Sequence, residues 1–155
     1  MTDALTRLQA AGVLAPLDVQ LARTLERFEP GQSMPVLLGA AFASRAIGHG
    51  HVCADLRQLT ARPLTGADGA TIDDVRLPPV FEWVMELGQS ALCSDGSSST
   101  PAIDAGSTDD TTHGSGPTPL VFDGEARLYL TRYWTYQSQL AASLARRSRA
   151  VLPVD

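Results

Sequence analysis

One stretch of the chain, from Ser33 to about Ile47, predicts a helix that is apolar on nearly every side. A helix without a polar face has no side to turn toward water, so it belongs at the centre of a fold. Ser33 is a suitable N-cap residue, and Pro35 lies in the first turn, where a missing N–H costs little. Gly48 is a natural stop for the helix. The other elements must therefore enclose this segment.

Two further helices carry apolar residues at helical spacing. The first opens at Pro16 and ends before Pro30, and its repeat of about four residues predicts a buried stripe made of Leu17, Leu21, Leu25 and Phe28. The second opens at Pro79, and its predicted stripe consists of Val80, Phe81, Val84, Met85 and Leu87. Trp83 falls beside that stripe. We expect both stripes to pack against the central segment.

The C-terminal third predicts a hairpin followed by one long helix. Residues 119–122 and 127–130 are strand-like and flank the turn residues Asp123 and Gly124. Thr131 can cap the last helix, whose expected buried face consists of Trp134, Gln137, Leu140, Ala141 and Leu144. A buried, unpaired carboxylate is costly, so this assignment predicts that Leu140→Asp unfolds the domain. The expected fold class is mainly α, a compact helical domain with a small β-hairpin before the last helix.

Residues 94–118 differ in composition from the rest of the chain. Ser, Thr, Gly and Asp dominate them, and Ile103 is their single large apolar residue. Such a segment cannot bury enough surface to offset the entropy of ordering it. We therefore expect a mobile loop at 94–118 within one domain that spans residues 1–150.

Composition excludes several classes of protein. The 155 residues suit a single domain, and the net charge of −5 disfavours a dedicated binder of nucleic acid or of a membrane surface. Residues 1–5 lack the basic and apolar regions of a secretory signal. The two cysteines are too few for a disulfide framework, which favours a cytoplasmic protein with reduced thiols.

The chain contains no lysine, because all of its twelve basic residues are arginine. A Walker A loop needs a lysine to reach the phosphates of ATP, and Schiff-base chemistry needs a lysine amine. The sequence also has no G-x-G-x-x-G and no G-x-S-x-G motif. We expect neither a bound cofactor nor a catalytic residue in this chain.

One short segment carries possible metal ligands. His49, His51 and Cys53 alternate, so an extended backbone would place them on one face. A closed zinc site needs four ligands, and the fourth could come only from a distant residue such as Cys93 or His113. A small metal-dependent hydrolase that uses these residues is therefore an alternative, as is a cysteine nucleophile. We favour Cys53 as a small buried hydrophobe.

Aromatic and cationic residues cluster at the start of the last helix. The tyrosines Tyr129, Tyr133 and Tyr136 and the tryptophan Trp134, near Arg127 and Arg132, have the make-up of a platform that stacks single-stranded DNA. The possible contact residues are Arg127, Arg132, Tyr133 and Trp134. Protein interfaces are also enriched in Tyr, Trp and Arg, and a hairpin packed on a helix needs aromatics for its core. Core packing is the preferred interpretation, with a protein contact or a DNA contact as the alternatives.

Three segments in a fixed order resemble a known family. They are PLDVQLA at 16–22, GHGHVCADL at 48–56, and PLV at 119–121 together with RLYLTRYW at 127–134. In their order and separations they resemble the N-terminal domain of RecD, the alpha subunit of bacterial exodeoxyribonuclease V. The resemblance extends from about residue 10 to residue 147.

The resemblance implies a non-catalytic assembly domain. In that family the domain precedes a 5′–3′ helicase motor, and the holoenzyme processes double-strand breaks for homologous recombination. The implied partners are RecC-type and RecB-type subunits, with DNA reached only through the assembled complex and no contact with a membrane. ATP and Mg²⁺ would belong to the absent motor domains, and residues 151–155 would begin a linker toward them.

Overall fold

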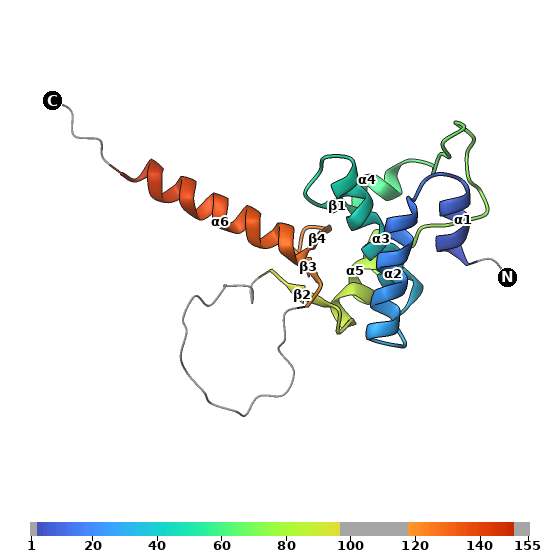
Figure 1. Ribbon diagram of the computed structural model, residues 1–155, viewed down its shortest axis with the longest axis horizontal. Coiled ribbons are helices and arrows are strands. Elements are labelled where there is room, and N and C mark those ends of the chain that lie inside the picture. Colours follow the sequence, from blue (N-terminus) through green and yellow to red (C-terminus); the bar gives the residue numbers. More distant parts are fainter. Residues whose placement is uncertain (1–2, 97–117, 151–155) are drawn as a thin grey trace.

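The computed structural model describes residues 3–96 and 118–150. Within these residues the chain forms helices around a central one, with a small sheet beside them and one long helix projecting away (Figure 1). The helices are α1 (Ala4–Ala10), α2 (Pro16–Phe28), α3 (Met34–Gly48), α4 (Leu56–Ala61), α5 (Val80–Gln89) and α6 (Thr131–Ser148). The strands are β1 (Ala54–Asp55), β2 (Cys93–Asp95), β3 (Leu120–Phe122) and β4 (Arg127–Leu130). The predicted fold class is confirmed.

Helix α3 is the centre of the core, as its sequence predicts. Every residue from Val36 to Ser44 is buried, and helices α1, α2 and α5 as well as strands β1 and β4 contact it. Gly39 allows the closest approach, because a Cβ atom there would lie 2.9 Å from a Leu128 side-chain carbon. Ser33 occupies the N-cap position as expected, although its buried hydroxyl makes no hydrogen bond.

The predicted stripe of α5 is wrong for Phe81 and Met85, which are exposed. Trp83, expected beside the stripe and against a neighbouring element, packs against α3. The Trp83 side chain is fully buried, whereas Phe81 is 75% exposed. The indole of Trp83 donates a hydrogen bond to the carbonyl of Pro35 over 2.7 Å and meets the ring of Phe42 edge-on. Trp83 therefore hydrogen-bonds a carbonyl in the first turn of α3 and also fills the core. With Trp83 on the inner side of α5, Phe81 faces the solvent.

The predicted stripe of α2 is also partly wrong. Leu17 is 73% exposed and Phe28 is 78% exposed, and the buried face instead consists of Asp18, Val19, Ala22 and Leu25. The physical reason is Asp18, whose carboxylate accepts hydrogen bonds from the Ala15 N–H and from the Ser44 hydroxyl of α3. A buried carboxylate requires such partners, so Asp18 sets which side of α2 faces α3.

The predicted hairpin forms and belongs to a larger sheet. Strands β3 and β4 pair antiparallel, β1 pairs antiparallel with β4, and β2 runs parallel to β3, which gives the order β1-β4-β3-β2. Ser94 and Asp95 lie in β2, so the loop predicted at 94–118 starts too early. Most of that loop, residues 97–117, lies outside the described residues, and so do residues 151–155.

The buried face predicted for α6 is wrong. None of the residues of this helix is buried, and Leu140 and Leu144 are 61% and 56% exposed. The other helices and the sheet already enclose α3, so α6 meets the sheet through β3 and β4 at its first turn and projects away from the body (Figure 1). Thr131 is not the cap that the sequence predicts: Leu130 occupies the N-cap position without a side-chain hydrogen bond. Thr131 is the first residue of the helix, and its hydroxyl donates to the Thr118 carbonyl.

The two aromatic positions of α5 provide a matched stability test. We expect Trp83→Ala to lower the free energy of unfolding by about 3–5 kcal/mol, because it removes a large buried side chain. Phe81→Ala is the control, and we expect a change within about 0.5 kcal/mol because that ring lies at the surface. Urea unfolding followed by circular dichroism measures both, and equal effects would contradict the described packing of α5.

Candidate protein-docking surface

An apolar stripe runs along the projecting helix α6. Tyr133, Tyr136, Leu140 and Leu144 follow one another three or four residues apart, so they share one side of the helix. Tyr136 is 51% exposed, and both leucines are more exposed still. The rings of Tyr133 and Tyr136 meet edge-on at 6.2 Å. We call these four residues the docking stripe.

The base of α6 is fixed to the sheet on a different side from the stripe. Trp134 packs edge-on against Tyr129 of β4, with ring centroids 4.9 Å apart. Gly96 lies so close that a Cβ atom there would be 2.7 Å from the Trp134 ring. These contacts hold the first turn of the helix, so the stripe is presented in one direction relative to the body.

A groove in the body meets the start of the stripe. It has a volume of about 800 Å³ and lies between the α1–α2 turn, the end of α3 and the start of α6. Its apolar lining includes Leu17, Leu21, Ile47, Leu130 and Tyr133. Because Tyr133 belongs to both, the groove and the docking stripe form one continuous apolar surface. Large exposed apolar surfaces of this kind mark sites of interaction with other proteins.

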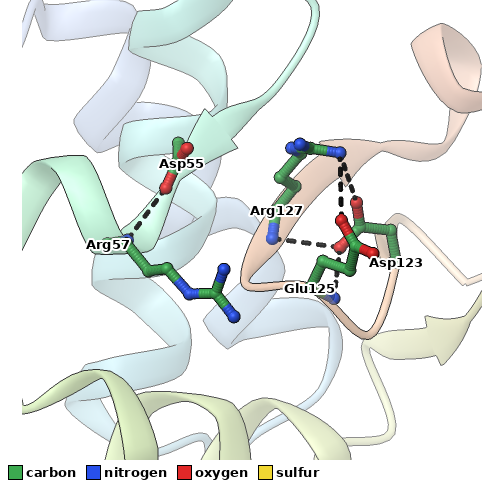
Figure 2. A network of polar contacts seen from close by, with 5 residues as sticks. All are labelled: Asp55, Arg57, Asp123, Glu125 and Arg127. Atoms are coloured by element: carbon green, nitrogen blue, oxygen red, sulfur yellow. Dashed lines mark hydrogen bonds and ion pairs between the residues drawn. The ribbon is translucent and has the colours of Figure 1, made fainter.

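The structure separates the four residues predicted for a partner or DNA contact. Arg127 lies beside two carboxylates of the hairpin turn, 3.5 Å from Asp123 and 3.6 Å from Glu125 (Figure 2). The ring of Trp134 faces the sheet, while Tyr133 belongs to the docking stripe. The guanidinium of Arg132 lies 5.5 Å from the ring centre of Tyr136 and donates to its hydroxyl. The four therefore do not share one surface, and their roles stay predictions.

Among the described residues, the segment with possible metal ligands gains no further ligand, and the candidate His113 lies outside the described residues. A ring nitrogen of His49 lies 2.8 Å from the carbonyl of Arg45, and His51 is exposed. In the part of the chain that the structure describes, no three side chains of His, Cys, Asp or Glu gather as metal ligands would. His49, His51 and Cys53 line an open cleft of about 710 Å³.

Neither cysteine has the surroundings of an activated nucleophile. Burial raises the pKa of the Cys93 thiol from its ordinary 9.0 to about 12. Burial also raises the pKa of the Cys53 thiol, against a smaller lowering by a hydrogen bond with Tyr129. A nucleophilic cysteine needs a lowered pKa, which neither thiol has. Cys53 is half-buried and lines the open cleft, so the prediction of a buried Cys53 is wrong.

No helix among the described residues has both the length and the apolar content that crossing a membrane requires.

The raised thiol pKa values predict slow alkylation. Between pH 7 and about pH 9, we expect iodoacetamide to modify Cys93 more slowly than Cys53, and both more slowly than free cysteine, because the thiolate is the reactive form. The raised pKa of Cys93 also implies a stabilising contribution that is present below about pH 9 and lost as the pH rises toward 12. Mass spectrometry of quenched samples follows each site, and fast modification of Cys93 near pH 7 would contradict this environment.

The exposure of α6 reverses the effect expected of Leu140→Asp. Because Leu140 lies at the surface, we now expect this substitution to change the free energy of unfolding by no more than about 0.5 kcal/mol. Leu128→Asp, at a fully buried position of β4, is the control that should unfold the domain. Thermal melting of the two variants separates an exposed stripe from a buried one.

Comparison with known proteins identifies the family. Residues 10–108 match the family described as RecBCD enzyme subunit RecD, N-terminal domain. The chain is 30% identical over 134 residues to the RecBCD enzyme subunit RecD of two Mycobacterium tuberculosis strains, CDC 1551 / Oshkosh and ATCC 25618 / H37Rv. These matches cover 86% of this chain and 18% of each relative, so the chain spans about a fifth of their length. The chain therefore belongs to the family of RecD N-terminal domains.

Proposed function

We propose that this domain is a protein-docking module that attaches a RecD-type helicase subunit to RecB- and RecC-type subunits. The single observation that carries the proposal is the docking stripe. The stripe runs along a helix that projects from the body, and none of its four residues is buried in the core. Tyr136, Leu140 and Leu144 are exposed to solvent. Exposed apolar side chains of this size are stabilised by a protein partner that removes them from water.

The family supplies the partners of the proposal. The relatives are named as subunits of RecBCD, an assembly of several different chains. A subunit of such an assembly needs a surface for its neighbours, and interfaces of standard size take about 800 Å² from each partner. The docking stripe together with the groove lined by Leu17 and Ile47 offers a surface of this kind.

In this proposal, ATP hydrolysis and DNA cleavage take place in other parts of the assembly. The chain has no lysine with which a phosphate loop could hold ATP, so in this proposal ATP and Mg²⁺ are bound by motor domains outside it. The domain itself is non-catalytic, and residues 1–150 form the docking unit. Its role in the repair of double-strand breaks would place it in the cytoplasm.

A second candidate function is guidance of single-stranded DNA toward the motor. Arg132 and Tyr136 favour it, since a cation over an exposed aromatic ring is a common feature of stacking sites. The paired charges of Arg127 and the inward-facing ring of Trp134 speak against it. Titration of a labelled oligothymidine separates the two functions, because a docking module should bind it only weakly and without sequence preference.

The docking function is tested with the RecB- and RecC-type subunits of the same organism. We expect the double variant Leu140→Gln, Leu144→Gln to weaken association by roughly 30-fold, which corresponds to about 1 kcal/mol for each of two leucines at the centre of the interface. Glutamine keeps good helix propensity and adds no charge. Titration calorimetry of the full-length subunit carrying these changes measures the effect.

The control is Phe81→Gln on α5. This ring is also exposed and apolar but lies off the docking surface, so the variant should bind as the wild type does. Wild-type affinity of the α6 double variant would overturn the assignment of α6. Loss of binding by the Phe81 variant alone would move the interface to α5.

A further inference from the structure

Helix α6 has a charge pattern opposite to that of the whole chain. Between Thr131 and Ser148 it carries Arg132, Arg146 and Arg147 and no carboxylate, while the chain as a whole has a net charge of −5. The side chains of Arg146 and Arg147 are exposed, and the structure gives them no ion pair among the described residues. All charged side chains on the helix that carries the docking stripe are therefore positive.

The arginines border the stripe. Arg132 precedes Tyr136 by four residues, and Arg147 follows Leu144 by three, so each lies next to a stripe residue on the helix surface. In the first turn of α6, the guanidinium of Arg132 lies over the Tyr136 ring, so it stays close to the apolar side chains of the stripe. A surface that covers the stripe must therefore also meet these guanidinium groups.

Helix stability explains only part of this pattern. Arg146 and Arg147 lie in the last turn, where cations interact favourably with the helix dipole. Arg132 lies in the first turn, where the dipole disfavours a cation. The contacts of Arg132 with Tyr136, four residues later, offset part of that cost. An interaction across the stripe accounts for the arginines at both ends of the helix.

A second copy of this chain is a poor partner for α6. Parallel pairing of two such helices would bring the arginines of the last turns together, and antiparallel pairing would bring Arg132 close to Arg147. Like charges across an interface cost free energy and suppress such pairings. The charge pattern therefore favours a different polypeptide that carries carboxylates.

We infer that α6 docks into an apolar groove of a RecB- or RecC-type subunit whose rim carries Asp or Glu side chains opposite Arg132 and Arg147. This inference rests on the proposed docking function and adds the chemistry of the partner surface. The apolar stripe supplies burial, while the arginines set the register of the helix and speed association by attraction to the acidic rim.

The absence of lysine from the chain permits a direct test. Arg147→Lys keeps the charge and introduces the single lysine amine of these 155 residues, which a carbodiimide can couple to a neighbouring carboxylate as an amide, with loss of water. In the assembled complex we expect position 147 to be joined to an Asp or Glu of the partner. Arg57→Lys on α4, an exposed position off the docking surface, is the control and should give no such product. Peptide mass spectrometry distinguishes these products from coupling at the N-terminal amine.

Affinity measurements separate this inference from the docking function. We expect Arg132→Gln, Arg147→Gln to weaken association roughly 10-fold at low salt and to flatten its dependence on salt. Suppose that the double arginine variant binds as the wild type does, that position 147 forms no cross-link, and that Leu140→Gln, Leu144→Gln still weakens binding. The inference of an acidic rim on the partner is then overturned, while the docking function stands. If the leucine variant binds normally, the docking function fails first.

Other occupants of α6 give distinct results. Binding of oligothymidine that is lost in the Arg132→Gln, Arg147→Gln variant would assign the arginines to DNA and overturn the inference. Binding to phosphatidylcholine–phosphatidylserine vesicles with the same loss would assign α6 to a lipid surface and overturn it as well.

Discussion

The architecture depends on the need to enclose α3 on every side. From Val36 to Ser44 this helix presents no residue to water, so α1, α2, α5 and the sheet are each required to cover part of it. Two polar contacts fix the covering elements: Asp18 with Ser44 holds α2, and Trp83 with the Pro35 carbonyl holds α5. Once these elements are in place the core is complete. Helix α6, which follows them in the chain, is left with an apolar stripe and no place inside.

The amino-acid sequence predicts the elements of this fold better than their orientation. The central helix, the hairpin and the mainly α class follow from periodicity, proline and glycine positions and the apolar content of residues 33–47. The facing of α2 does not, because a count of apolar residues gives no weight to a buried aspartate. The facing of α5 is present in the sequence, since Val80, Trp83, Val84 and Leu87 share one side at helical spacing. The hydrogen bonds that bury Asp18 and Trp83 depend on partners 26 and 48 residues away, which periodicity cannot locate.

The docking stripe illustrates the same limit for function. Its spacing is visible in the sequence, and the sequence analysis chose Leu140 and Leu144 correctly as one face of α6. It assigned that face to the core, since an amphipathic helix predicts burial without stating by which molecule. Tyr133 and Tyr136 both belong to the aromatic cluster that the sequence indicates as a possible contact, and Arg132 lies beside them. The exposure of Leu140 and Leu144 relates this cluster to the arginines at the far end of the helix.

The way α6 leaves the body also has a mechanical consequence. The helix is held near its start, by Trp134 against Tyr129 and Gly96 and by a hydrogen bond between Gln137 and Tyr129. The rest of its 18 residues project beyond that point. At 1.5 Å per residue it is about 27 Å long, so a tilt of about 10° at its base displaces its tip by about 5 Å. Such a helix acts as a lever arm. Whatever molecule holds the tip sets the angle of the whole domain, and small rearrangements at the aromatic pivot are magnified at the far end.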